Sequence, residues 1–210
     1  GSHIGVMRRD AGVESIRWFT TDACYVFHPM NMWDDGDRLH ADVMEYEAAP
    51  LFPNADGSRG RETRAHLVRW TFDLVGTSNT IVRTQLDDIP GEFPRFDERR
   101  AGLPYRHGWF AGRVRGEETM VFDSIVHLDL QTGSREVYAF PPGDVPAEPV
   151  FIPRGTDEGD GWLATIVYRA QENRSDFVLL DAQNIAKGPV GCAQLPRRVP
   201  FGFHGNWVPA

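Results

Sequence analysis

The chain has 210 residues, of which 41% are hydrophobic, enough for one large folded domain or two small ones. It carries 22 Lys and Arg against 30 Asp and Glu, a formal net charge of −8, and no basic cluster, which argues against a nucleic-acid partner. Its longest apolar runs, such as WLATIVY, are far shorter than the roughly 18 residues of a membrane-spanning helix. With no secretory signal at its start, we expect no stable membrane insertion and a cytoplasmic location.

The beginning of the chain and its cysteines give further expectations. Residues 1–3, GSH, look like an expression-tag remnant, and the following IGVMRRDAG has neither a signal nor the look of a natural start. The sequence therefore predicts a piece of a longer polypeptide over residues 4–210. Cys24 and Cys192 lie far apart with no C-x-x-C spacing, which favours two buried thiols over a redox or zinc motif.

Alternation of apolar and polar residues dominates the chain and predicts strands. A strand is expected over residues 38–46, followed by another over 67–74, in which Val68, Trp70, Phe72 and Leu74 share one face. Residues 124–140 predict a hairpin turning at Thr132 and Gly133, and residues 162–182 a second one turning at 172–175.

Two polar segments, residues 53–65 and 140–149, are interpreted as surface connections because the β pattern resumes on both sides of each. The chain has 21 Gly and 15 Pro, its connections are rich in both, and it is therefore expected to be all-β and antiparallel. The residues alone leave a sandwich and a propeller open, because no strict repeat is visible.

Four short stretches place a histidine or a glutamate beside aromatic residues and a proline: YVFHPMN, GEFPRFDER, AEPVFIPR and PFGFHG. Taken singly, each has a simple structural interpretation. His28 fits a core histidine, Glu92 and Glu148 could pair with an arginine such as Arg95, and His204 could lie in a frayed end. No G-x-S-x-G motif occurs, so a serine hydrolase has little support.

The remaining histidines carry weaker signals. His40 and His127 occupy polar positions of their strands, and His66 follows a charged loop. His107, in PYRHGWF, is interpreted as a packing or turn residue.

Together and in this order, the four stretches resemble the carotenoid oxygenase family, which includes lignostilbene dioxygenases. The segment FHPMNMWDDGD, with His28 and Asn31, is similar to the family's F-H-x-x-N-A pattern, and GFHG, with His204, is similar to its C-terminal histidine motif. EFPR at Glu92 and EPVFIPR at Glu148 are similar to two further family stretches. The resemblance implies part of a seven-bladed β-propeller, about three to four antiparallel blades.

The resemblance also implies a metal site. Family members hold one iron(II) ion, Fe(2+), by four histidines on the propeller axis, and glutamates bind the outer ring nitrogens of three of them. Carried over, His28 and His204 are metal ligands, while Glu92 and Glu148 orient ligand rings. The implied reaction is oxidative cleavage of a conjugated C=C bond of an apolar small molecule by O2, which gives two carbonyl products.

This chain departs from the family pattern in two respects. Met32 stands where the family usually has Ala, so Met32 joins Phe27 and Phe203 as a candidate residue of the substrate cavity. The first two histidines and the third glutamate have no counterpart, which predicts that an N-terminal half of the propeller is missing. A phenylpropenoid or stilbene substrate is preferred over an apocarotenoid. The alternative is a catalytically silent β-propeller fragment or binding module that lacks a complete iron site.

Overall fold

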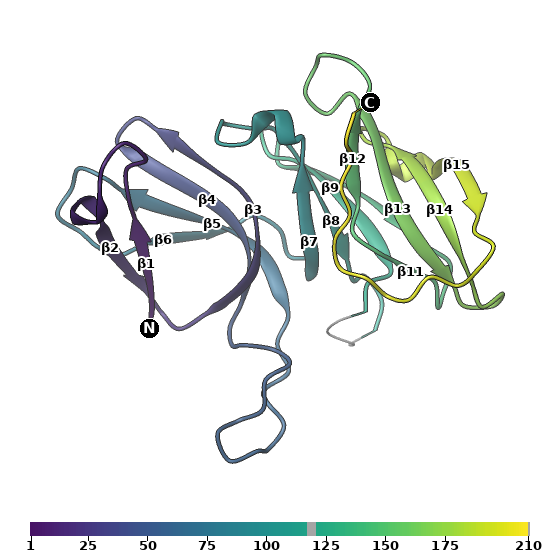
Figure 1. Ribbon diagram of the computed structural model, residues 1–210, viewed down its shortest axis with the longest axis horizontal. Helices are drawn as coiled ribbons and strands as arrows, with labels where there is room; N and C mark the ends of the chain where they lie inside the picture. Colours follow the sequence, from purple (N-terminus) through teal and green to yellow (C-terminus); the bar gives the residue numbers. More distant parts are fainter. Residues whose placement is uncertain (117–120, 210) are drawn as a thin grey trace. The chain divides into compact units, whose positions relative to one another are not determined.

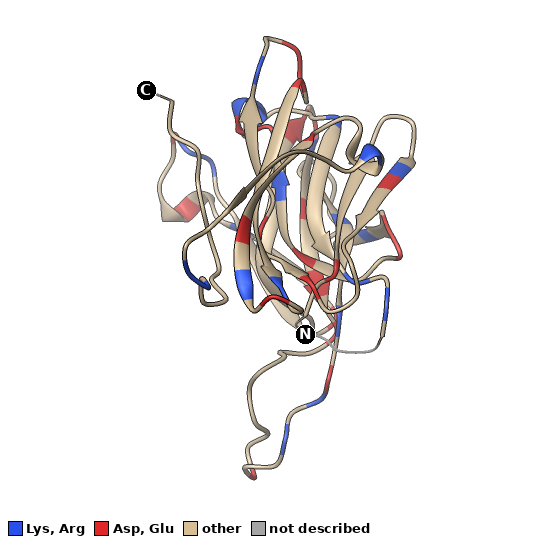
Figure 2. Ribbon diagram, turned by 90° about the vertical axis from the view of Figure 1, so that its right-hand side faces the viewer, with Lys and Arg blue, Asp and Glu red and all other residues tan. Residues whose placement is uncertain are grey.

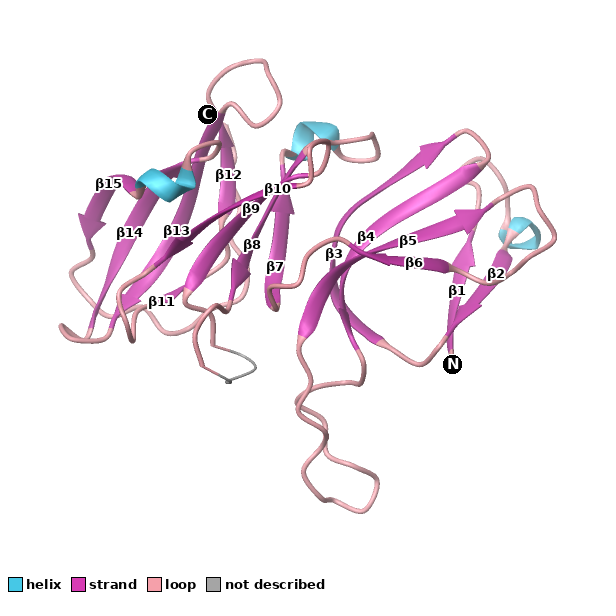
Figure 3. Ribbon diagram, turned by 180° about the vertical axis from the view of Figure 1, so that it is seen from behind, coloured by secondary structure: helices cyan, strands magenta, loops and turns pink. Residues whose placement is uncertain are grey.

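The computed structural model of the chain describes residues 1–116 and 121–209. The chain forms two compact units, Gly1–Asp88 and Ile89–Ala210. In both units the strands pair antiparallel, and the helical elements of the described residues are three short 3-10 turns (Figure 3). The prediction of an all-β antiparallel chain is therefore confirmed, whereas the closed seven-bladed ring stays a prediction.

The first unit contains a two-stranded and a four-stranded sheet (Figure 1). Its elements are β1 (Ser2–Val6), η1 (Val13–Ser15), β2 (Arg17–Thr21), β3 (Tyr25–Asp35), β4 (Arg38–Tyr46), β5 (Ala65–Asp73) and β6 (Val82–Gln85). The four-stranded sheet has the order β3-β4-β5-β6, so each strand pairs with the next one along the chain.

The core of the first unit lies between these two sheets. The predicted apolar face of β5 is buried there, and Phe72 meets Phe19 of β2 edge to face, with ring centroids 5.2 Å apart. The opposite face of β4 is buried as well, because Asp42 is fully buried and accepts two hydrogen bonds from Arg69, each 2.8 Å long. A buried carboxylate with a bidentate arginine keeps its hydrogen bonds satisfied.

The second unit contains a four-stranded and a five-stranded sheet that pack face to face. The first is formed by β7 (Gly91–Phe96), β8 (His107–Gly112), β9 (Ser124–Asp129) and β10 (Ser134–Ala139), with η2 (Glu98–Arg100) after β7. The second is formed by β11 (Val145–Pro146), β12 (Val150–Pro153), β13 (Gly161–Arg169), β14 (Arg174–Asp181) and β15 (Pro189–Gln194), with η3 (Ile185–Lys187) before β15. Trp109 and Phe151 stack between the sheets at 5.0 Å, and the Trp109 indole donates to the Ala182 carbonyl at 2.8 Å.

Several sequence expectations need correction. The turn between β13 and β14 spans residues 170–173 rather than 172–175, with Asn173 at φ +48°. Residues 140–149 are not a plain surface loop, because β11 pairs with β13 there and Asp144 is buried. Cys192 is exposed, since β15 is the edge strand of its sheet, and Cys24 is only half-buried. The hairpin turn at Thr132 and Gly133 is confirmed.

Three further observations concern the ends and the surface of the chain. Ser2 and His3 form the first positions of β1, opposite Thr21 and Thr20, and the assignment of residues 1–3 to a tag remnant stays a prediction. Basic and acidic residues are interspersed among the described residues of both units (Figure 2). Within the described part of the chain, no helix is long and apolar enough to cross a membrane.

Candidate functional site

Three of the four candidate site residues occupy the same topological position. His28 lies in β3, Glu92 in β7, and Glu148 two residues before β12. Each of these strands pairs with one neighbour only and therefore lies at an edge of its sheet. His204 lies beyond β15, in the C-terminal segment of residues 196–209, which is drawn beside β12 in Figure 1. The candidates therefore gather on the first strands of the sheets and on the chain end.

The ladders are irregular next to two of the candidates. The register of β3 against β4 shifts between Val26 and Pro29, around His28. The register of β7 against β8 shifts between Glu92 and Arg95, and Phe93 takes up the bend with φ +56°. A bulge re-aims the side chains near it and is common beside functional sites. Proline in both stretches fits these positions, because it cannot donate a ladder hydrogen bond.

Glu148 and His204 lie together although 56 residues separate them in the sequence. The His204 Nδ1 is 3.2 Å from Glu148 Oε1, and the Gly205 backbone N–H donates to Glu148 Oε2 at 2.8 Å. The Glu148 side chain is 5% exposed, whereas that of His204 is 53% exposed. One buried carboxylate thus holds both the imidazole and the backbone that follows it.

Two residues of β7 complete this cluster. The Arg95 Nη1 is 3.3 Å from Glu148 Oε1 and donates to the Gly205 carbonyl at 3.1 Å. The Phe93 ring stands edge-on to the imidazole of His204, with 5.8 Å between the ring centroids. The cluster therefore joins the first strand of one sheet, the start of another and the C-terminal segment.

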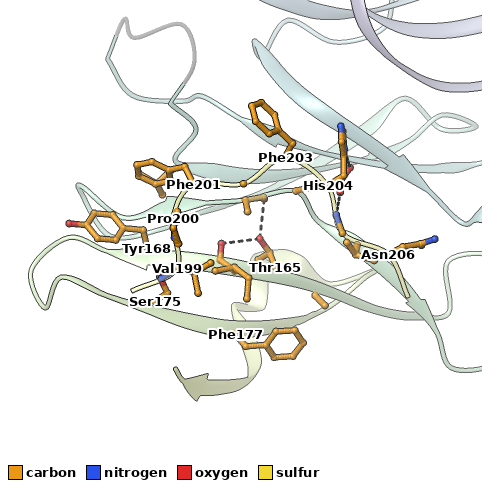
Figure 4. A pocket seen from close by; sticks show the side chains of 18 of the residues that line it. Thr165, Tyr168, Ser175, Phe177, Val199, Pro200, Phe201, Phe203, His204 and Asn206 are labelled. Carbon is orange, nitrogen blue, oxygen red and sulfur yellow. Dashed lines mark hydrogen bonds and ion pairs between the residues drawn. The ribbon is translucent and has the colours of Figure 1, made fainter. Parts of the chain in front are cut away.

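A groove of about 400 Å³ lies beside this cluster, between the C-terminal segment and the second sheet of the unit. Figure 4 shows the segment from Val199 to Asn206 on one side of it and the strands that carry Thr165 and Phe177 on the other. Apolar side chains dominate the lining, to which Glu148 and His204 also belong. Phe203 also lines the groove and is 71% exposed.

The candidates of the first unit lie in an aromatic cluster. The Phe27 ring packs edge to face on Tyr25 and Tyr46, at 4.7 and 5.6 Å, and lies 6.2 Å from the half-buried ring of His28. Met32 is 51% exposed. Since His28 and His204 belong to different units, their convergence on one point stays a prediction.

Glu92 is buried, and its carboxylate accepts a hydrogen bond from the Phe93 backbone N–H at 2.7 Å. Its pairing with a metal-facing histidine stays a prediction. Among the described residues no group of three or more His, Cys, Asp or Glu side chains could hold a metal ion.

The donor chemistry of the Glu148–His204 pair nevertheless fits a metal ligand. A ligating histidine in proteins gives its second ring nitrogen to a carboxylate, a carbonyl or a water, which fixes its orientation. With Nδ1 on Glu148, Nε2 is the nitrogen that would coordinate. A neutral imidazole is a suitable ligand for iron(II).

The second unit contains a buried pair of histidines that the sequence did not predict. The His107 Nδ1 is 3.0 Å from the His127 Nε2, and both side chains are buried beside Trp109. The prediction that His127 occupies a polar position was wrong, because every residue of β9 is buried. Burial lowers the pKa of both rings, and the neighbouring His107 contributes to the fall at His127, whose pKa is lowered to about 4. His127 pairs across the strands with the buried Trp109, a neighbour that indicates burial but that the sequence alone does not identify.

Comparison with known proteins identifies the family. Residues 1–209 match the family described as retinal pigment epithelial membrane protein (RPE65). The chain is 36% identical over 222 residues to isoeugenol monooxygenase of Pseudomonas nitroreducens, covering 100% of this chain and 46% of the relative. It is 38% identical over 229 residues to lignostilbene-alpha,beta-dioxygenase isozyme III of Sphingomonas paucimobilis, covering 99% and 46%.

A solved structure agrees with these matches. The crystal structure of Pseudomonas brassicacearum lignostilbene dioxygenase superposes with a TM-score of 0.92 at 30% identity, over 99% of this chain and 47% of that chain. The chain thus spans about half the length of the curated relatives it matches. From the four motifs, the antiparallel sheets and these matches, the chain belongs to the carotenoid oxygenase family, the one described as retinal pigment epithelial membrane protein.

Proposed function

We propose that this chain is the C-terminal part of a non-haem iron(II) dioxygenase, which cleaves a conjugated C=C bond with O2 to give two carbonyl products. The observation that carries the proposal is the carboxylate-held imidazole of His204 beside an apolar groove. The family's oxygenases, named for isoeugenol and lignostilbene, support the reaction class.

In the intact protein, His28 and His204 would hold iron(II) together with two histidines from the N-terminal half. Iron(II), when bound, supplies the activation of O2 without an organic redox cofactor. Glu148 accepts a hydrogen bond from the Nδ1–H of His204, so the ring stays in the tautomer that presents Nε2. Glu92 is proposed to do the same for a further ligand.

The substrate is proposed to be a phenylpropenoid or a stilbene. The relatives named for isoeugenol and lignostilbene are 36% and 38% identical, whereas the apocarotenoid-15,15'-oxygenase of Synechocystis is 28% identical. Phe27, Met32 and Phe203 are proposed to line the cavity. Their apolar side chains would exclude water and receive a conjugated ring.

The proposal is tested on the full-length polypeptide, reconstituted with iron(II) under anaerobic conditions. We expect stoichiometric iron and cleavage of a hydroxystilbene or isoeugenol, with the aldehyde products identified by mass spectrometry. His204→Ala should lose both iron and activity, whereas Gln171→Ala, at an exposed position of the turn between β13 and β14, should keep both. Wild-type protein that takes up no iron would favour the silent binding module. Cleavage of an apocarotenal alone would overturn the proposed substrate.

A further inference from the structure

The guanidinium of Arg95 contacts both the carboxylate that holds His204 and the backbone next to that histidine. We infer that Arg95 is a positioning residue, which acts on His204 by fixing Glu148 and the C-terminal segment to β7. The effect on a bound metal rests on the proposed function, whereas the fixing of the segment does not.

The contacts of Arg95 span three parts of the unit. Its side chain is 14% exposed, and Nη1 reaches both Glu148 Oε1 at 3.3 Å and the Gly205 carbonyl at 3.1 Å. Its Nη2 donates to Glu98 and lies 3.4 Å from Asn206 Oδ1. The planar fork of a guanidinium allows such divided contacts, which the point charge of a lysine cannot reproduce.

Arg95 matters for Glu148 because that carboxylate is buried. Glu148 Oε1 faces two groups, the guanidinium of Arg95 and the imidazole of His204, while Oε2 accepts the Gly205 N–H. Burial of a carboxylate is costly unless opposite charge and hydrogen bonds accompany it. The guanidinium supplies that charge, and its position fixes which oxygen faces the ring.

Arg95 matters for the C-terminal segment because residues 196–209, all described by the structure, belong to no strand. Hydrogen bonds bracket Gly205 on both sides, since its N–H donates to Glu148 and its carbonyl accepts from Arg95. A second attachment lies further back, where the Val199 N–H donates to Ser175 Oγ at 2.9 Å. Loss of Arg95 would therefore release one of the two bonds next to His204.

The chain offers a matched control in Arg154. Both arginines follow a proline, in FPR and IPR, and both lie in the second unit. Arg154 forms an ion pair with Asp160 at 2.6 Å and lies over the Trp162 ring at 5.3 Å. It follows β12 in the sequence, whereas Glu148 precedes that strand. Arg154→Gln thus removes the same charge from the same unit without removing the contacts of Arg95.

The first measurement is hydrogen exchange in the metal-free, full-length polypeptide. In Arg95→Gln, the backbone amides of residues 203–208 should exchange about tenfold faster or more. The reason is that a charge-assisted hydrogen bond, which stabilises the closed state by about 1.5 kcal/mol, is lost. Arg95→Lys should fall between this variant and the wild type, and Arg154→Gln should match the wild type. Equal exchange in Arg95→Gln and Arg154→Gln would overturn the fixing of the segment. If Arg95→Gln does not fold, Arg95→Lys carries the comparison.

The second measurement is binding of cobalt(II) to the same variants, followed by its visible absorption. Arg95→Gln should bind the metal about 10-fold to 100-fold more weakly, with a shifted absorption band, since loss of an orienting partner has effects of this size. An unchanged band and affinity together with faster exchange would overturn the action on His204. Wild-type protein that binds no cobalt would overturn the proposed function, while the exchange result would still decide whether Arg95 fixes the segment.

Discussion

The buried histidine pair predicts an acid-sensitive second unit. Below pH 6.5 the unfolded chain binds a proton at His127, which the folded chain binds only near its lowered pKa of about 4. The unfolded state therefore binds more protons between pH 6.5 and about 4, and the free energy of unfolding must fall as the pH falls through this range. The gap of about 2.5 pKa units, at about 1.4 kcal/mol each, corresponds to about 3 kcal/mol.

The surroundings of the pair explain the direction. Neutral His107 and His127 share one N–H between facing nitrogens 3.0 Å apart, whereas two protonated rings would present two N–H groups to each other. Arg106 opposes the charge on both rings, and Asp129 favours it. Asp97 and Glu158 also favour the charge on His107, although burial outweighs them. Because the pKa of His107 is lowered too, its protonation adds to the loss.

The assay is urea unfolding of the full-length polypeptide at pH values from about 7 to about 4.5. His127→Gln keeps a polar side chain but does not titrate, so it should be less stable near pH 7 and show a flatter pH dependence than the wild type. Gln171→Ala, at the exposed turn between β13 and β14 of the same unit, is the control and should keep the wild-type dependence. An identical dependence in His127→Gln and the wild type would refute the argument from burial.

Three further changes have defined outcomes. Glu148→Gln in the intact protein should weaken iron retention about 10-fold to 100-fold with the fold preserved, and unchanged iron content would contradict its orienting role. Asp176→Asn should lower the free energy of unfolding in urea by about 2 kcal/mol, because the buried carboxylate accepts a hydrogen bond from Arg169 at 2.7 Å. Asp144 still pairs with that arginine in the variant, and an unchanged urea midpoint would count against the prediction. Gly159→Ala should lower the melting temperature, with a cost of about 1–3 kcal/mol, since φ is +75° and a Cβ would lie 2.6 Å from the His107 ring; equal melting temperatures would contradict it.

The alternation of apolar and polar residues predicted where the strands lie, but not which of their faces are buried by other sheets. The alternation along β5 correctly placed Trp70 and Phe72 in the core, because one face of that strand is more exposed than the other. In β9 both faces are buried, so alternation carries no information there and His127 was assigned to the wrong environment. Burial on both faces depends on the packing of sheets, which a single strand's sequence does not encode.

The candidate site residues were predicted from family motifs and not from the periodicity of apolar residues. Glu148 and His204 were singled out by resemblance, and their contact depends on a chain reversal over 56 residues that no periodicity reports. The role of Arg95 depended on a detail of backbone geometry. The register shift after Glu92 turns the strand, and only the folded chain shows that the arginine then reaches the C-terminal segment.

The bulges in β3 and β7 also determine how these segments tolerate changes in length. From Val26 to Pro29 the strand advances three residues while its partner advances two, from Glu45 to Val43. Deletion of Phe27 would remove this bulge and leave the flanking residues paired as before and on their original faces, but His28 would then be the single residue between Val26 and Pro29, without the bulge that sets the direction of its side chain. Single-residue deletions in this stretch would thus yield folded protein with a displaced His28, whereas the hairpin tips would accept insertions with little effect.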